Sequence, residues 1–306
     1  MTLRSYRARA SALAAVMIAA TSCSSHNGTK SAIAHALPRP IAQTTGLAHP
    51  ESARYDSAAD VYYVSNINGD PAARDDNGFI DIVSADSFKV ILTLVRGGKN
   101  GVTLNAPKGL ALAGDTLWVA DIDAMRAFNK HDGALLQSID LTPLHATFLN
   151  DVAVGGDGAV YVTDTGTGDS TKATGNVIFR ISGGRATVAL STPALDAPNG
   201  ITWDARIHRF LIAPGGKNVE SWAPGDPQPT PYAAGPGTYD GIELLSDGRV
   251  LVTSWADSAV HLISGGSMTT IIRHVNGPAD IGVDTRRGIL ALPRLLANKV
   301  QYFRIQ

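Results

Sequence analysis

Six stretches of the chain repeat one pattern of polar and apolar positions. A short polar corner leads into an apolar strand, a tight turn follows, and a second strand rich in β-branched and aromatic residues comes next. The corners begin at Pro50, Pro107, Leu149, Pro198, Tyr239 and Pro278. Successive corners are 57, 42, 49, 41 and 39 residues apart, close to the length of a four-stranded propeller blade with its loops. Six copies therefore predict an all-β fold, a six-bladed β-propeller.

Turn signals and strand boundaries support this prediction. Asp157-Gly158 and Asp247-Gly248 separate the two strands of their repeats, and such dipeptides favour tight β-hairpins. Beyond residue 22 no long stretch has apolar residues at helical spacing. The last repeat is followed by one further strand-like segment, 299–305, so its blade is one strand short. We expect 41–45 to complete this blade, because closing the ring removes the exposed edges of an open sheet.

The first 22 residues have the order of a secretory signal peptide. Arg4, Arg7 and Arg9 form a basic segment, 11–20 form a short uncharged segment, and small residues precede Cys23. The apolar segment is too short to span a bilayer as a helix. Cys23 lies where a bacterial lipobox places its lipidated cysteine, so we expect a lipoprotein signal peptide. The alternative is an ordinary cleaved signal peptide followed by an unrelated cysteine.

Three parts are predicted along the chain: the signal peptide (1–22), the lipidated Cys23 with a flexible tether (23–40), and the propeller (41–306). The tether has a mixed composition without periodicity. Because Cys23 is the only cysteine, an internal disulfide is excluded and the core alone must stabilise an exported domain. We expect the protein to be exported and anchored by lipid to the bacterial cell envelope, at the outer membrane where there are two.

The charge of the chain argues against nucleic acid as a partner. Removing 1–22 takes away three arginines and changes the formal net charge from −1 to −4. No basic patch or run of charges remains in the rest of the chain. We therefore expect a monomer whose partner is a small molecule, with membrane contact through the lipid anchor.

The six corners are expected to converge, because the innermost strand of every blade lines the channel of a propeller. We name the second residues of the corners the corner ring: Glu51, Lys108, Asn150, Asn199, Asp240 and Ala279. Asp151 and Asp280 follow two of them. Two carboxylates and two amides from four blades are oxygen ligands that suit Ca²⁺ or Mg²⁺, with Mn²⁺ or Zn²⁺ as alternatives at lower coordination. Each corner taken alone also fits a plain turn, since Asn and Asp are common turn formers.

From about residue 47 to 306 the chain resembles the SMP-30/gluconolactonase group of six-bladed propellers, which includes regucalcin and other lactonases. In that group a Glu in the first blade, an Asn in a Ser/Pro-Asn-Gly corner and an Asp in a Pro-Asp-Gly corner hold a divalent cation. An Asn-Asp pair in a blade between them lies close to the substrate. The matching segments here are Pro50-Glu51-Ser52, Pro198-Asn199-Gly200, Tyr239-Asp240-Gly241 and Asn150-Asp151.

The resemblance implies a role for each matching residue. Glu51, Asn199 and Asp240 would hold one divalent cation, with Ca²⁺ the first expectation. Asn150 would contact the substrate, and Asp240 or Asp151 would take a proton from the attacking water. The group's Arg two places before the Asn-Asp pair is Phe148 here, and its aromatic residue shortly after the first Glu appears as Tyr55, slightly displaced.

The function implied is that of a metal-dependent hydrolase of the SMP-30/gluconolactonase type, which opens a lactone or a related ester. The missing arginine puts sugar-acid lactones in doubt and allows a more apolar substrate. The alternative is a non-catalytic exported propeller that binds a small ligand or a protein partner. Phe148 favours that alternative and the intact ligand set disfavours it. Other chemistries find no support, since the chain has no Gly-x-Ser-x-Gly elbow and no His-Glu-x-x-His pair.

Overall fold

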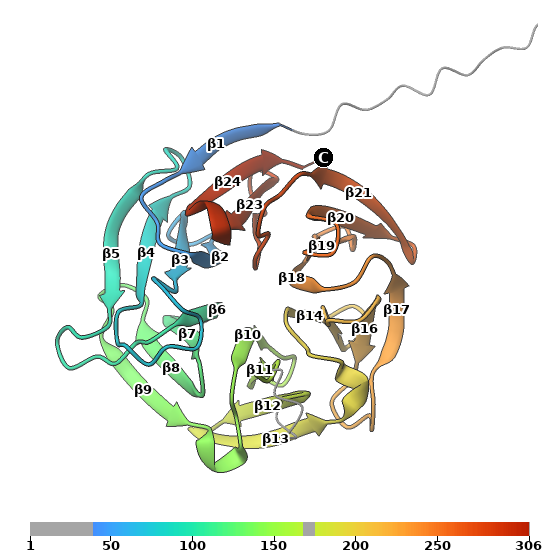
Figure 1. The fold of residues 1–306 in the computed structure, drawn as a ribbon, viewed down its shortest axis with the longest axis horizontal. Helices are drawn as coiled ribbons and strands as arrows, with labels where there is room; N and C mark the ends of the chain where they lie inside the picture. The colour runs from blue at the N-terminus through green and yellow to red at the C-terminus, as the bar shows by residue number, and fades with distance from the viewer. Residues whose placement is uncertain (1–38, 168–174, 306) are drawn as a thin grey trace, which may run out of the picture. The chain divides into compact units, whose positions relative to one another are not determined.

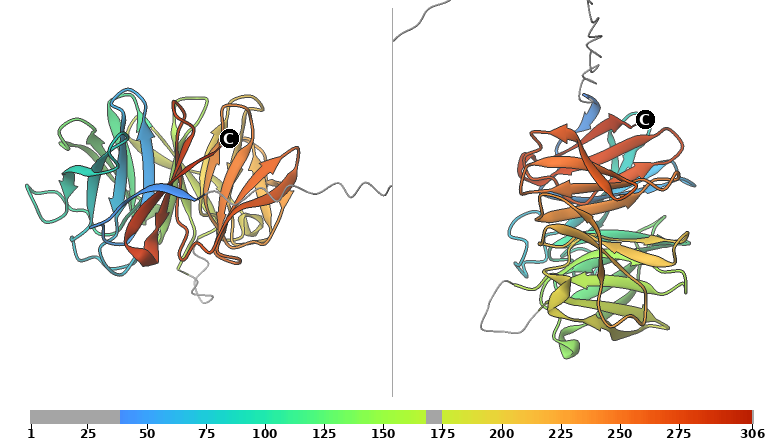
Figure 2. Two further views of the ribbon diagram at one scale, coloured as in Figure 1. Left: turned by 90° about the horizontal axis from the view of Figure 1, so that it is seen from above. Right: turned by 90° about the vertical axis from the view of Figure 1, so that its right-hand side faces the viewer.

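The computed structural model describes residues 39–167 and 175–305, in which the chain forms six four-stranded antiparallel sheets. The sheets are arranged radially about one axis (Figure 1) and stand side by side like blades when seen from the side (Figure 2). The predicted six-bladed β-propeller is therefore confirmed. The predicted signal peptide, Cys23 and nearly all of the tether lie outside the described residues.

Five blades each consist of four consecutive strands, ordered from the axis outward. Blade 1 contains β2 (Pro50–Asp56), β3 (Val61–Asn66), β4 (Phe79–Ser84) and β5 (Val90–Arg96). Blade 2 contains β6 (Pro107–Ala113), β7 (Thr116–Asp121), β8 (Ala124–Asn129) and β9 (Leu135–Asp140). Blade 3 contains β10 (Leu149–Val154), β11 (Val160–Asp164), β12 (Val177–Ser182) and β13 (Arg185–Ser191). Blade 4 contains β14 (Ile201–Asp204), β15 (Arg209–Ile212), β16 (Asn218–Trp222) and β17 (Thr230–Ala234). Blade 5 contains β18 (Tyr239–Leu244), β19 (Val250–Ser254), β20 (Ala259–Ser264) and β21 (Ser267–Arg273).

The helices of the described residues are three short 3₁₀ turns: η1 (Thr142–Leu144), η2 (Pro193–Leu195) and η3 (Leu295–Ala297). Within 39–167 and 175–305 no helix has the length and apolar character needed to cross a bilayer. All six corners found in the sequence lead into the innermost strand of a blade, as predicted.

Blade 6 combines the two ends of the propeller. It contains β22 (Gly282–Asp284), β23 (Ile289–Arg294) and β24 (Lys299–Arg304), and its outermost strand is β1 (Pro40–Thr44). The strand expected at 41–45 is thus observed, paired antiparallel with β24. Thr44 Oγ1 donates to the carbonyl oxygen of Phe88 at 2.7 Å and lies 2.9 Å from the Tyr302 hydroxyl oxygen. Because Phe88 belongs to blade 1, Thr44 joins blade 6 to its neighbour where the ring closes.

The hydrophobic core lies between neighbouring blades. Six clusters of buried side chains each combine residues of two adjacent sheets. Between blades 3 and 4, the ring centroid of Phe210 lies 4.5 Å from that of Tyr161 and 5.8 Å from that of Trp222. Burying one large apolar side chain contributes about 1.5–3 kcal/mol. The blades therefore hold their neighbours in place, which fixes the corners at the axis.

The inner strands carry a bulge where the corner ring begins. Their register with the second strands shifts between Pro50 and Ala53, Pro107 and Leu110, Leu149 and Val152, and Tyr239 and Ile242. A bulge removes a residue from the ladder and can re-aim its side chain. The residues displaced in this way include Glu51, Lys108, Asn150 and Asp240.

Replacing Thr44 by Val should destabilise the closure of the ring. Val has nearly the same shape but leaves the Phe88 carbonyl oxygen and the buried Tyr302 hydroxyl without this partner. Losing such bonds costs about 1–3 kcal/mol. Chemical denaturation should show that loss, whereas Thr45→Val, at an exposed neighbouring position, should leave the free energy of unfolding within about 0.5 kcal/mol. Equal effects of the two substitutions would contradict the role given to Thr44.

Candidate functional site

The corner ring is brought together by direct contacts between neighbouring inner strands. The Asp280 amide donates to the Glu51 carbonyl oxygen at 2.8 Å, and the Gly200 amide donates to the Asp240 carbonyl oxygen at 2.8 Å. Glu51, Lys108, Asn150 and Asp240 are each no more than 6% exposed. The residues that the sequence placed at equivalent corners are therefore close in space and almost withdrawn from solvent.

Glycine permits this close approach at three corners. A Cβ atom on Gly109 would collide with the backbone of Asp151, one on Gly200 with the carbonyl of Asp240, and one on Gly241 with the backbone of Asp280. These glycines follow Lys108, Asn199 and Asp240 in the chain. Each of those side chains is thus held beside the corner of the next blade.

Hydroxyl groups on the second strands satisfy the backbone at the bulges. Ser65 Oγ accepts from the Ser52 amide at 2.9 Å, and Thr163 Oγ1 accepts from the Asp151 amide at 3.0 Å. Thr253 Oγ1 accepts from the Gly241 amide at 2.7 Å. Buried backbone donors without partners are costly, so these bonds stabilise the displaced corners.

Four oxygen atoms of the corner ring are buried and have no hydrogen-bond partner. They are Glu51 Oε2, Asn150 Oδ1, Asn199 Oδ1 and Asp240 Oδ1. They come from blades 1, 3, 4 and 5. Buried polar atoms are nearly always satisfied in native proteins, so four such oxygens in one ring indicate a place for a ligand.

Neighbouring side chains fix the orientation of two of these groups. Asn150 Nδ2 donates to Thr165 Oγ1 at 2.9 Å, which leaves Oδ1 of the same amide free. Trp255 Nε1 donates to Asp240 Oδ2 at 2.7 Å, which leaves Oδ1 of that carboxylate free. Sequence reasoning missed both Thr165 and Trp255. They lie at the end of β11 and β19 rather than at a corner, and no motif signals them.

Burial makes the carboxylates of the ring resist ionisation. Desolvation, followed by the charge of Asp240, raises the pKa of Glu51 well above its usual value. Desolvation raises the pKa of Asp240 to about 7, against the opposing effect of the Trp255 hydrogen bond. A bound cation would oppose both shifts, since its charge favours the ionised form of each acid.

The donor set fits a hard divalent cation. Two carboxylate and two amide oxygens, all unpaired and buried, are the ligand types that Ca²⁺ and Mg²⁺ take in proteins. In 39–167 and 175–305, no three His, Cys, Asp or Glu side chains form a metal-binding group. A cation here would therefore depend on the amide oxygen of Asn199 as well as on Glu51 and Asp240, with the amide oxygen of Asn150 left for another ligand.

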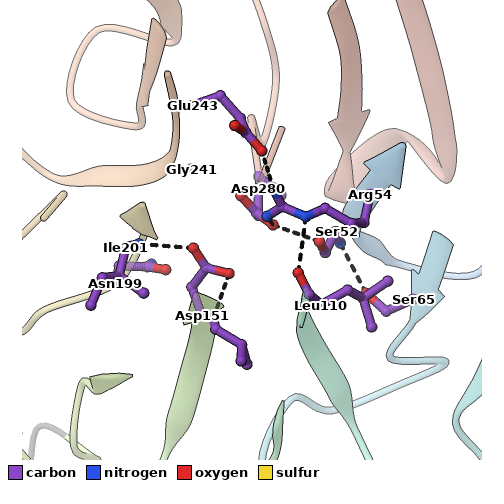
Figure 3. Close-up of polar contacts among 12 residues, drawn as sticks. Ser52, Arg54, Ser65, Leu110, Asp151, Asn199, Ile201, Gly241, Glu243 and Asp280 are labelled. Atoms are coloured by element: carbon purple, nitrogen blue, oxygen red, sulfur yellow. Dashed lines mark hydrogen bonds and ion pairs between the residues drawn. The ribbon is translucent and has the colours of Figure 1, made fainter. Parts of the chain in front are cut away.

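Asp151 differs from the ring residues because both of its oxygens have partners. Oδ1 accepts from the Val152 amide at 2.7 Å, and Oδ2 accepts from the Ile201 amide at 2.8 Å (Figure 3). Its carboxylate joins β10 of blade 3 to β14 of blade 4. Desolvation, followed by the charge of Asp280, raises its pKa well above the usual value.

The Arg54 side chain reaches from blade 1 across the propeller axis, further along the inner strands than the corner ring. Its guanidinium group donates to the Leu110 carbonyl oxygen at 2.9 Å, pairs with the Glu243 carboxylate, and lies 3.4 Å from Asp280 Oδ2 (Figure 3). Asp280 Oδ2 also accepts from Ser52 Oγ at 2.5 Å. One arginine of blade 1 thus contacts blades 2, 5 and 6. The sequence contained no sign of this role, because it depends on the reach of one side chain across the axis.

A cavity of about 270 Å³ is lined by Arg54 and by residues that follow the corners along the inner strands. Its lining includes Tyr55 and Trp203, which come from later positions on β2 and β14 than the corners. Tyr55 donates to Asp60 Oδ1 at 2.8 Å. The aromatic residue noted in the sequence is therefore placed away from the corner ring.

The fold and the ring together define a class of protein: a six-bladed propeller with buried oxygen ligands at the axis. Residues 50–281 match the family model described as SMP-30/Gluconolactonase/LRE-like region. The match spans most of the chain, so this protein belongs to that family. The resemblance inferred from the corners is confirmed.

Solved structures agree with the fold. A candidate gluconolactonase is 15% identical over 89% of this chain and 92% of its own, with a TM-score of 0.63. Virginiamycin B lyase from Staphylococcus aureus is 12% identical over 84% of this chain and 95% of its own, with a TM-score of 0.58. The WD40 β-propeller domain of Doa1 is 13% identical over 86% and 81%, with a TM-score of 0.60. No curated protein sequence matches. These likenesses establish the fold, and the site must carry the function.

The stability of the cation-free protein should fall as pH rises from about 5 to about 7. The native state keeps the proton of Asp240 up to a pKa of about 7, whereas the unfolded chain loses it near 3.8. The native state therefore binds more protons in this range, and raising the pH favours unfolding. Denaturation in chelator at several pH values measures this slope. Asp240→Asn should make the slope shallower, with the raised pKa values of Glu51 and Asp151 supplying the remainder, and a slope of opposite sign in the wild type would contradict the assignment.

Replacing Arg54 by Met should destabilise the protein by about 2–4 kcal/mol, because the half-buried Glu243 and the buried Asp280 would lose their cationic partner. The double variant Arg54→Met/Glu243→Gln should recover part of this loss, since it removes one of the uncompensated charges. Urea denaturation measures both. If the double variant is as unstable as the sum of its single variants, the charge explanation is wrong.

Proposed function

We propose that this protein is a divalent-cation-dependent hydrolase that opens the ring of a lactone or cleaves a related ester. The observation that carries the proposal is the set of four buried, unpaired oxygens at the axis. Family membership supports the reaction class, because the matched family model includes gluconolactonases in its description. The solved structures support the fold only.

The residues of the ring have distinct roles in this proposal. Glu51, Asn199 and Asp240 would hold the cation through their free oxygens. Asn150 would contact the substrate, with its amide held in place by Thr165. When bound, a divalent cation supplies Lewis-acid polarisation of the substrate carbonyl.

Asp240 is the better proton acceptor of the two carboxylates predicted from the sequence. Oδ1 of Asp240 accepts no hydrogen bond, so beside a cation it keeps a second lone pair for a proton, whereas backbone amides bind both oxygens of Asp151. Trp255 holds the Asp240 carboxylate in one orientation. Asp240 would take a proton from the attacking water while the water oxygen bonds to the carbonyl carbon, and ring opening gives a hydroxy acid. Asp151 would keep blades 3 and 4 in register.

Cation binding and turnover should both depend on Asp240. Chelator-treated protein should gain about 2.7 kcal/mol of stability from Ca²⁺ at 100 times its dissociation constant. Asp240→Ala and Asn199→Ala should lose this gain and reduce lactone hydrolysis roughly 10²- to 10⁴-fold. Thermal unfolding and acid release from a panel of lactones measure the two effects.

The matched control is Asp247→Ala, which removes an exposed carboxylate from the hairpin of the same blade. It should keep both properties. No stabilisation by Ca²⁺, Mg²⁺, Mn²⁺ or Zn²⁺ would overturn the cation-dependent hydrolase. Stabilisation without turnover of any lactone or ester would instead support the alternative, a propeller that binds a ligand without catalysis.

A further inference from the structure

The ring position of blade 2 holds a buried lysine. Lys108 is 2% exposed, and the hydrogen bond recorded for its Nζ in the described part of the chain goes to the Ala106 carbonyl oxygen at 3.3 Å. The same nitrogen lies 4.1 Å from the ring centroid of Phe148. An ammonium group has three N–H donors, so within 39–167 and 175–305 this environment leaves donor capacity unused, close enough to Glu51 for its charge to act on the lysine.

The position of the ammonium group is fixed by its surroundings. Gly109 allows β6 to approach β10 closely, which holds Lys108 beside Asn150. The Phe148 amide donates to Asp164 Oδ1 at 2.9 Å, and the Thr165 amide donates to the Phe148 carbonyl oxygen at 3.1 Å. An aromatic face attracts a cation at this distance. Phe148 therefore supports Lys108 from the neighbouring blade.

Lys108 is not used as an ordinary ion-pair partner. It forms no ion pair within 39–167 and 175–305, although the charge of Glu51 is close enough to favour its protonated form. Burial outweighs that effect and lowers the pKa of Lys108 to about 8. The group is therefore protonated at neutral pH, yet it releases its proton more readily than an exposed lysine.

We propose that Lys108 is the catalytic proton donor to the leaving oxygen when the lactone opens. The inference deepens the proposed function and rests on it. The water oxygen forms a bond to the carbonyl carbon while Asp240 takes the water proton. The bond from that carbon to the ring oxygen then breaks, its electron pair stays on the oxygen, and Lys108 Nζ gives that oxygen a proton. Proton return from Asp240 through solvent restores the ammonium group.

Two lactones with different leaving groups test this assignment. δ-Valerolactone expels an alkoxide, which needs a proton in the transition state. Dihydrocoumarin expels a phenolate, whose conjugate acid has a pKa near 10, so it leaves without that help. Lys108→Met keeps the length and packing of the side chain and removes the proton. It should lower kcat for δ-valerolactone roughly 10²- to 10⁴-fold and that for dihydrocoumarin by less than about tenfold.

If the Lys108→Met protein does not fold, two further variants still test the assignment. Lys108→Arg retains a cation over Phe148 but holds its proton too tightly to transfer it, so it should show the same selective loss. Phe148→Leu should show a smaller loss in the same direction, because it removes only the support of the ammonium group. Ca²⁺ titration followed by thermal unfolding should give the wild-type affinity for Lys108→Arg.

The outcomes separate the two proposals. An equal loss for both lactones, no loss, or a change in KM alone would overturn the assignment of Lys108 while leaving the hydrolase intact. Full activity of Lys108→Arg on δ-valerolactone would show that the charge suffices, and would also overturn it. If the wild-type protein with bound Ca²⁺ hydrolyses neither these two lactones nor any other lactone or ester of the panel, the proposed function fails, and the proton donor with it.

Discussion

Buried negative charge on the propeller axis is the constraint on which the rest of the site depends. Five carboxylates converge there, from Glu51, Asp151, Asp240, Glu243 and Asp280. The packing of the blades and the glycines at three corners force this approach. Burial raises the pKa of the four carboxyl groups that lie in the corners, so their ionised forms need compensation. The hydrogen bonds and ion pairs at the axis supply part of this compensation.

The groups that compensate these charges differ between two levels of the axis. One level is the corner ring, and the other, called the inner level, contains Arg54, Asp151, Glu243 and Asp280. At the inner level, Arg54 pairs with Glu243 and lies near Asp280, and backbone amides bind both oxygens of Asp151, while Asp280 Oδ1 has no partner. At the level of the corner ring, one oxygen of Glu51 and one of Asp240 remain without partners. A satisfied polar network makes a structure rigid, whereas an unsatisfied one is costly unless a ligand completes it. Most polar groups of the inner level are paired and support the blades, whereas the corner ring has four unpaired oxygens and is the part available for binding.

Features that follow from the repeat could be predicted from the sequence. Contacts made by individual side chains could not. The six corners, the closing strand predicted at 41–45 and observed at 40–44, and the convergence of Glu51, Asn199 and Asp240 follow from equivalent positions in a radial fold. Arg54 lies three residues beyond the corner residue Glu51, and nothing in its local sequence indicates a contact across the axis. Trp255 follows the end of β19, so its hydrogen bond to Asp240 requires the three-dimensional arrangement of the loop. No sequence period and no sequence motif indicates such contacts.

Phe148 stands where the family has an arginine, and its contact with the neighbouring blade changes the interpretation of this difference. The sequence indicates only the loss of a cation next to the substrate position. In the structure, the ring of Phe148 supports the ammonium group of Lys108, so positive charge is present at the corner ring but comes from blade 2. A guanidinium group binds paired oxygens in one plane and keeps its proton, whereas a lysine with a pKa of about 8 can release one. In the proposed mechanism, the cation at this place would serve proton transfer rather than substrate recognition, so a substrate that leaves as an alkoxide would gain most from it.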